Sequence, residues 1–176
     1  MTYDIAGLKR RVLAVYPYFG SVASKVEYRE IPGAAAIVSR GETVFYDPAY
    51  MHAFTTEEQV FLLARELCRI AFRMEARGAG KDPVVWQTAT EAVLNQHLKR
   101  DGLAIVRGGI DYPEAIDYDS EEYYEFLMAE RLDIELEGGQ LQGQENPVGG
   151  SGDGESDGDD GDDPDLADLL ELLPTE

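Results

Sequence analysis

The stretch Val60–Phe72 contains the residues whose types and spacing come nearest to a catalytic motif. Its centre, Arg65-Glu66-Leu67-Cys68-Arg69, has the spacing of H-E-x-x-H with an arginine at each histidine position. In H-E-x-x-H, two histidines on one helix face bind zinc and the glutamate is the general base of a protease. A guanidinium stays protonated and has no lone pair to offer a metal. The stretch therefore predicts a helix with the spacing of a metal site but without its ligands.

The surrounding sequence predicts a mostly helical domain with a small β-hairpin. Apolar residues at helical spacing predict a first helix that Pro17 kinks or ends, and two β-favouring runs flank a turn at Arg40-Gly41. Thr55 or Thr56 is expected to cap a long helix that runs to about Arg77. Further helices are expected from residues 83 and 120, with a loop between them.

The order of these elements resembles a known family. The segments that carry the likeness are "FYDPAYMHAFTTEE", the Arg65–Arg69 helix, "WQTATEAVLNQHL" and "YDSEEYYEFL". Over about residues 8–131 the chain resembles the zincin-like metallopeptidase domain that commonly precedes a VWA-like domain in bacterial and phage proteins, often encoded near MoxR-type AAA+ ATPases. The positions that match the family pattern are Tyr46, Pro48, Thr55 or Thr56, Glu58, Glu66, Arg77, Ala89, Asn95 and Leu98.

The resemblance implies an α+β, mostly helical fold with a zincin-like helical core over residues 1–137. It places Arg65 and Arg69 at the two histidine positions, Glu66 at the general-base position and Glu91 where an aspartate ligand is expected. One carboxylate does not hold zinc, and two guanidiniums repel it. We therefore expect a degenerate site with no metal, no cofactor and no catalysis, in which Arg65 and Arg69 pair with Glu91 and Glu66.

The charge is concentrated at the end of the chain. Of its 35 acidic residues, 12 lie in the segment 138–176, which has none of the 15 Lys and Arg residues. Residues 138–163 are rich in Gly, Asp and Ser and are predicted to be a disordered acidic linker. Residues 164–176 are predicted to form a short acidic amphipathic helix. Its expected partner-binding residues are Leu166, Leu169, Leu170 and Leu173, and the alternative is that these leucines dock on the chain's own domain.

The remaining candidate ligands are few. The single cysteine, Cys68, excludes an internal disulfide and a Cys-based zinc site, and we expect it to be a small buried apolar residue. The two histidines, His52 and His97, are not expected to form a metal site with Glu91. The opening "MTYDIAGLKRR" lacks the apolar core of a signal peptide, and no apolar run is long enough to span a bilayer, so we expect a cytoplasmic protein.

Three functions are compatible with these features. The favoured one is a non-catalytic metallopeptidase-like protein that acts as a protein-binding, adaptor or regulatory module. A phage origin is compatible with this function. Its partner would be a basic protein, or a VWA or AAA+ protein supplied in trans. The net charge of −20 argues against direct binding of nucleic acid or anionic membranes. One alternative is an acidic inhibitor that mimics nucleic acid and blocks a host protein, and another is a metal-dependent hydrolase with a rebuilt site.

Overall fold

The computed structural model describes residues 3–141, and side chains as far as residue 131. A compact unit covers Met1–Glu130, and a second unit begins at Arg131. The α-helices of the described chain are α1 Ile5–Val15, α2 Gly20–Lys25, α3 Pro48–His52, α4 Thr56–Ala71, α5 Met74–Arg77, α6 Pro83–Arg100 and α7 Ser120–Leu141. Short 3₁₀ helices cover Pro17–Phe19 (η1) and Pro113–Asp117 (η2). The fold is mostly helical with one small sheet, as the sequence predicted.

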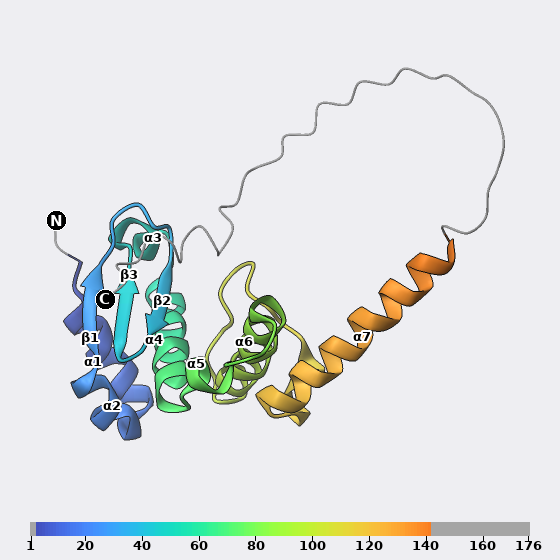
Figure 1. Cartoon of the computed structure of the whole chain (residues 1–176). Helices are drawn as coiled ribbons and strands as arrows, with labels where there is room; N and C mark the ends of the chain where they lie inside the picture. Colours follow the sequence, from blue (N-terminus) through green and yellow to red (C-terminus); the bar gives the residue numbers. More distant parts are fainter. Residues whose placement is uncertain (1–2, 142–176) are drawn as a thin grey trace, which may run out of the picture. The chain divides into compact units, whose positions relative to one another are not determined.

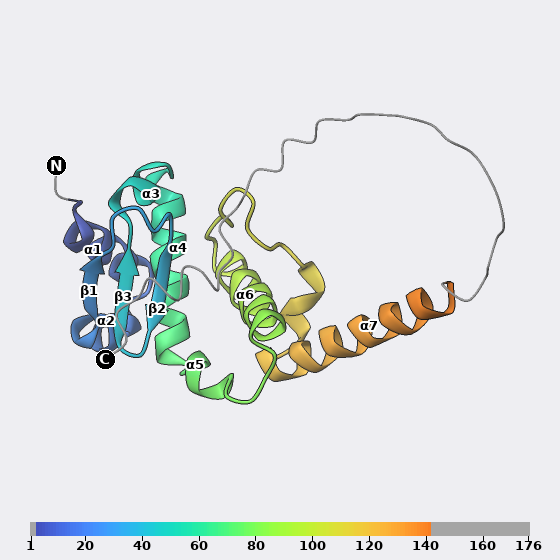
Figure 2. The same cartoon turned by 45° about the horizontal axis from the view of Figure 1, so that its top comes forward.

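The sheet has three strands, of which the sequence predicted two. The expected hairpin is present: β2, Ile37–Arg40, pairs antiparallel with β3, Thr43–Tyr46, across the turn at Gly41. The additional strand β1, Glu27–Glu30, pairs parallel with β3 and gives the order β1-β3-β2. Its side chains are mostly exposed, so it lacks the apolar alternation that marks a strand in a sequence. Figures 1 and 2 show α4 lying alongside β2, which is consistent with the contacts between these two elements.

Helix α4 supplies the centre of the core. Thr55 is its N-cap and forms a capping box with Glu58, which satisfies backbone N–H groups that have no partner within the helix. Its largest buried side chains are almost completely excluded from solvent: Phe61, Leu62, Leu63 and Leu67. Helix α4 packs against α1, α2, β2 and α6. Because most positions of α4 are buried, a charged side chain at one of these buried positions needs a partner.

The expected end of this helix at Arg77 is wrong. Helix α4 ends at Ala71, and the separate short helix α5 follows from Met74 to Arg77. Between them Arg73 adopts a left-handed backbone conformation, with φ 55° and ψ 42°. No glycine marks this break, and left-handed backbone is rare for a residue with a side chain. The sequence therefore contained no signal for it.

Helices α6 and α7 complete the described chain. Asp82 caps α6 by accepting hydrogen bonds from Val84 and Val85, with Pro83 at the first helical position as predicted. The loop after α6 contains η2, which packs against α6. Helix α7 begins at Ser120 as predicted and reaches Leu141, so it crosses the predicted domain boundary between residues 137 and 138.

The rest of the predicted linker and the segment 164–176, with Leu166, Leu169, Leu170 and Leu173, lie outside the described residues. Between residues 3 and 141, no helix has the length and hydrophobicity that crossing a bilayer requires.

Candidate functional site: an arginine–glutamate cluster

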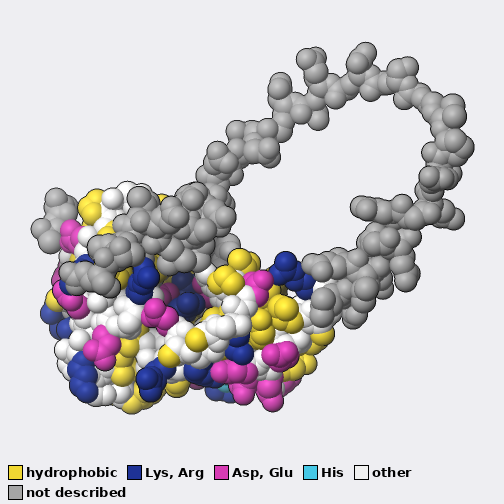
Figure 3. Space-filling view, viewed as in Figure 1, with side chains coloured by type: hydrophobic (Ala, Val, Ile, Leu, Met, Phe, Trp, Pro, Cys, Tyr) yellow, Lys and Arg dark blue, Asp and Glu magenta, His cyan; other side chains and the backbone are white. Residues whose placement is uncertain are grey.

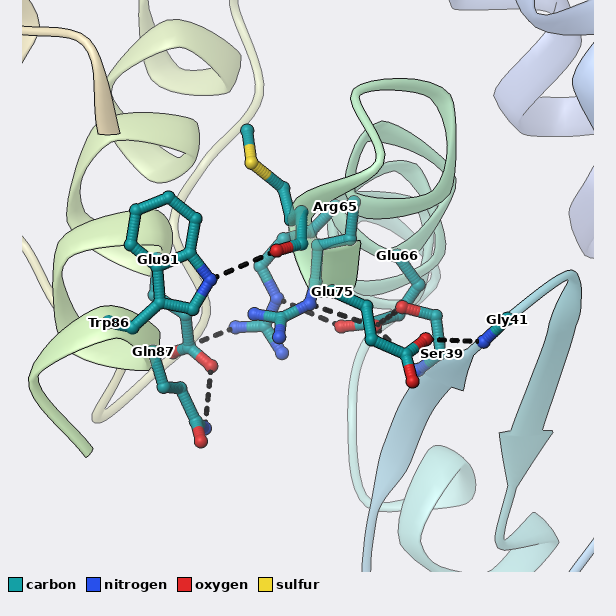
Figure 4. A network of polar contacts seen from close by, with 10 residues as sticks. Ser39, Gly41, Arg65, Glu66, Glu75, Trp86, Gln87 and Glu91 are labelled. Carbon is teal, nitrogen blue, oxygen red and sulfur yellow. Dashed lines mark hydrogen bonds and ion pairs between the residues drawn. The ribbon is translucent and has the colours of Figure 1, made fainter. Parts of the chain in front are cut away.

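Four residues named from the sequence are linked by ion pairs, three of them on α4 and one on α6, and we call them the arginine–glutamate cluster: Arg65, Glu66, Arg69 and Glu91. Arg65 lies between the two carboxylates. Its Nε is 3.3 Å from Glu66 Oε1, and its Nη1 is 3.4 Å from Glu91 Oε2. Figure 4 shows the guanidinium of Arg65 reaching from α4 to Glu91 on α6. One cation thus joins a carboxylate of each helix.

The helical spacing explains this placement. Residues four apart share a helix face, so Arg65 and Arg69 project on the same side of α4. Their environments nevertheless differ. The Arg65 side chain is 11% exposed and pairs with both glutamates, whereas the Arg69 side chain is 22% exposed and has its Nε 3.8 Å from Glu66 Oε2. That distance allows charge attraction but exceeds a hydrogen bond.

Glu66 is the most deeply buried member of the cluster, with its side chain 3% exposed. Its Oε2 accepts hydrogen bonds from the backbone N–H and the hydroxyl of Ser39, each 2.8 Å long. Its Oε1 faces Arg65 Nε. Both oxygens are therefore engaged, as a buried carboxylate requires.

Ser39 was not predicted as a site residue. It lies on β2, two positions after the buried Ile37, so both residues face the same side of the strand. This alternation was the one sequence signal that could have pointed to it. Ser39 ties the sheet to the cluster through Glu66.

Glu91 is held from its own helix as well. Its Oε1 accepts a hydrogen bond of 3.2 Å from Gln87 Nε2, one helical turn earlier on α6. Its side chain is 17% exposed. Burial alone would lower the pKa of Arg65, but the charges of Glu91 and Glu66 outweigh it and raise that pKa above its usual value. Arg65 is therefore a permanent cation.

The other candidate ligands lie elsewhere. His52 packs edge-on against Tyr3, with ring centroids 5.2 Å apart. Burial and the nearby Arg100 lower the pKa of His97, which lies near the end of α6. Cys68 is buried, and burial, with smaller effects from Glu66 and Asp101, raises the pKa of its thiol to about 12. Such a thiol is not ionised at neutral pH and behaves as a small apolar residue.

The cluster does not fit a zinc ion. Zinc binds lone pairs of neutral imidazole, thiolate or carboxylate, and Arg65 and Arg69 contribute guanidiniums, which have no lone pair to offer a metal. Within residues 3–131, no group of three or more His, Cys, Asp and Glu side chains is arranged to hold a metal. The chemistry of this donor set is that of an ion-pair network.

Comparison with known proteins assigns the family. A family model described as "Putative metallopeptidase domain" matches residues 2–171, which is nearly the whole chain. The chain therefore belongs to this family of metallopeptidase-like domains. No curated protein and no solved structure gives a significant match.

The difference between the two arginines yields a prediction. Arg65→Met keeps a long unbranched side chain but removes the cation that pairs with both Glu66 and Glu91. We expect it to lower the free energy of unfolding by about 3 kcal/mol. Arg69→Met is the matched control and should cost about 1 kcal/mol or less, because its pairing is longer and more exposed. Urea unfolding followed by circular dichroism measures both values, and equal losses would contradict the assigned roles.

Proposed function

We propose that this protein is a non-catalytic metallopeptidase-like protein that acts as a protein-binding or adaptor module. The observation that carries the proposal is the position of Arg65, whose guanidinium contacts both the general-base glutamate and the glutamate at the third-ligand position. A cation that cannot lose its proton at physiological pH stands where the family pattern requires ligands for a metal.

The state of Glu66 supports the same conclusion. A general base needs a free lone pair within reach of the proton that it removes. Here Oε2 accepts two hydrogen bonds from Ser39, and the neighbouring arginines provide the compensating positive charge. Both oxygens of Glu66 are thus engaged by groups of the protein itself, which leaves this carboxylate poorly placed to take a proton from a bound water.

Charge balance explains how the frame of a metal site persists without the metal. A zinc ion with a glutamate and an aspartate has two positive and two negative charges. The two guanidiniums, with Glu66 and Glu91, have the same balance. The substitution of both histidines therefore replaces the charge of the ion together with its ligands, and the buried carboxylates stay neutralised.

This balance yields a prediction about zinc. The wild-type protein should contain far less than one zinc per chain by elemental analysis, and neither zinc nor a chelator should change its melting temperature. The variant Arg65→His/Arg69→His/Glu91→Asp loses two cations, so its buried carboxylates should make its stability depend on added zinc. Near one zinc per wild-type chain, or hydrolysis of a peptide that a chelator abolishes, would overturn the non-catalytic assignment.

The adaptor role requires a partner, and we propose a VWA-like or AAA+ protein supplied in trans, with a phage or other bacterial origin for the chain. The support is the family resemblance together with the acidic segment that ends in Leu166, Leu169, Leu170 and Leu173. Leucines at this spacing form one face of a helix, the arrangement that docks in an apolar groove. The surrounding acids would steer it toward a protein with a basic rim rather than toward nucleic acid.

Removal of the segment 165–176 tests this role. We expect the deletion to abolish association with the partner in a pull-down and to leave the melting temperature of the remaining chain nearly unchanged. A matched full-length control replaces the four leucines with serine and keeps every charge. If the deleted protein still captures the partner, or if its melting temperature falls markedly, the leucine segment is not the partner-binding element.

A further inference from the structure

A second feature borders the arginine–glutamate cluster. A pocket of about 250 Å³ opens where the β2–β3 turn meets the end of α4 and the start of α5. Its lining includes Ser39, Arg69, Arg73, Glu42 and Glu75, and we call it the Arg73 pocket. Figure 3 shows acidic and basic side chains interspersed over one face of the molecule. The Arg73 pocket is thus a partly open hollow lined by charges of both signs.

Arg69 lines this pocket, and its hydrogen-bond donors are only weakly engaged within the described chain. Its guanidinium has five N–H donors, and its one ion pair within residues 3–131 is with Glu66, at 3.8 Å. Its side chain is only 22% exposed, so water hydrates it incompletely. A partly desolvated guanidinium with donors that no described side chain accepts at hydrogen-bond distance is a strong site for an oxyanion, because charge-assisted hydrogen bonds are among the strongest in proteins.

Arg73 is the second donor and the less expected one. It holds a left-handed backbone, which disfavours any residue with a Cβ, and its side chain is exposed. Among the residues whose side chains are described, none forms a hydrogen bond or ion pair with its guanidinium. Glycine or asparagine would suit this backbone better. A strained position that keeps a long cationic side chain without an internal partner points to a ligand outside the chain.

The acidic residues that line the pocket restrict which anions it can bind. Glu75 Oε2 accepts a hydrogen bond from the Gly41 backbone and so fastens the β2–β3 turn to α5, as Figure 4 shows. Glu42 lies on the same turn. These two negative charges oppose a doubly charged phosphate more strongly than a singly charged carboxylate. A planar carboxylate also matches the fork of a guanidinium.

We propose that the Arg73 pocket binds the carboxylate of an acidic side chain on a partner protein, with Arg69 and Arg73 as its donors. The proposal rests on the proposed function as a protein-binding module and assigns a recognition site to its described domain. This site uses other residues than the leucine segment, and its ligand carries the opposite charge to the basic rim expected of the partner of that segment. The arginine–glutamate cluster adjoins the site, because Arg69 belongs to both.

An NMR titration tests the proposal on the full-length protein. The probe is a short capped alanine peptide with one central glutamate, and its control is the same peptide with glutamine. The glutamate peptide should shift the side-chain Nε–Hε signals of Arg69 and Arg73 in a saturable manner, and the glutamine peptide should not. Equal responses to both peptides, shifts confined to other residues, or binding of inorganic phosphate without the glutamate peptide would overturn the proposal.

Variants of Arg73 separate a binding role from a structural one. Arg73→Gly should raise the melting temperature, because glycine adopts the left-handed backbone freely, and should bind the glutamate peptide roughly tenfold more weakly. Arg11→Gln on α1 is the control for the loss of one positive charge and should bind as the wild type does. Binding of wild-type strength by Arg73→Gly would overturn the proposal.

Failure of the carboxylate-binding proposal can be distinguished from failure of the proposed function. Zinc in the wild-type protein would remove the non-catalytic assignment whatever the peptide does. Absence of peptide binding would overturn the carboxylate-binding role of the Arg73 pocket. It would not affect the prediction about zinc or the proposed role of the leucine segment.

Discussion

The ion pairs of Arg65 join the two central helices of this protein through one buried cation. Arg65 belongs to α4, which lies in the middle of the core, and it contacts Glu66 on its own helix and Glu91 on α6. The burial of a carboxylate without a compensating charge costs free energy. Ser39 extends the network to the sheet through Glu66. The guanidinium of Arg65 therefore belongs to one polar network that connects α4, α6 and β2.

This constraint links the family's frame to the proposed loss of catalysis. A metallopeptidase of this type needs a cation between two helices to neutralise its acids and activate water. In this chain arginine can provide the neutralising charge but none of the coordination. In our proposal the packing of α4 against α6 depends on charge balance, whereas hydrolysis would depend on lone pairs and an open coordination position. We infer that the fold can stay stable at this site after the ability to catalyse hydrolysis has been lost.

Part of the fold and cluster was predictable because it depends on local periodicity. Helical spacing placed Arg65 and Arg69 on one face, and the family order placed Glu91 opposite them. The third strand, the role of Ser39 and the break at Arg73 were not predicted. Strand β1 pairs through its backbone and exposes most of its side chains, so its residues show no apolar pattern that would predict a strand. Ser39 depends on a contact between β2 and α4, and Arg73 adopts a backbone for which its residue type is a poor indicator.

A double-mutant cycle between Arg65 and Glu91 tests the central claim most directly. It compares the free energies of unfolding of the wild type, Arg65→Met, Glu91→Gln and the double variant, and so isolates the interaction across α4 and α6. If Arg65 neutralises Glu91 in the core, the two losses should be non-additive, with a coupling free energy of about 1 kcal/mol or more. Additivity to within about 0.3 kcal/mol would contradict the account, because the two helices would then be held together without this ion pair.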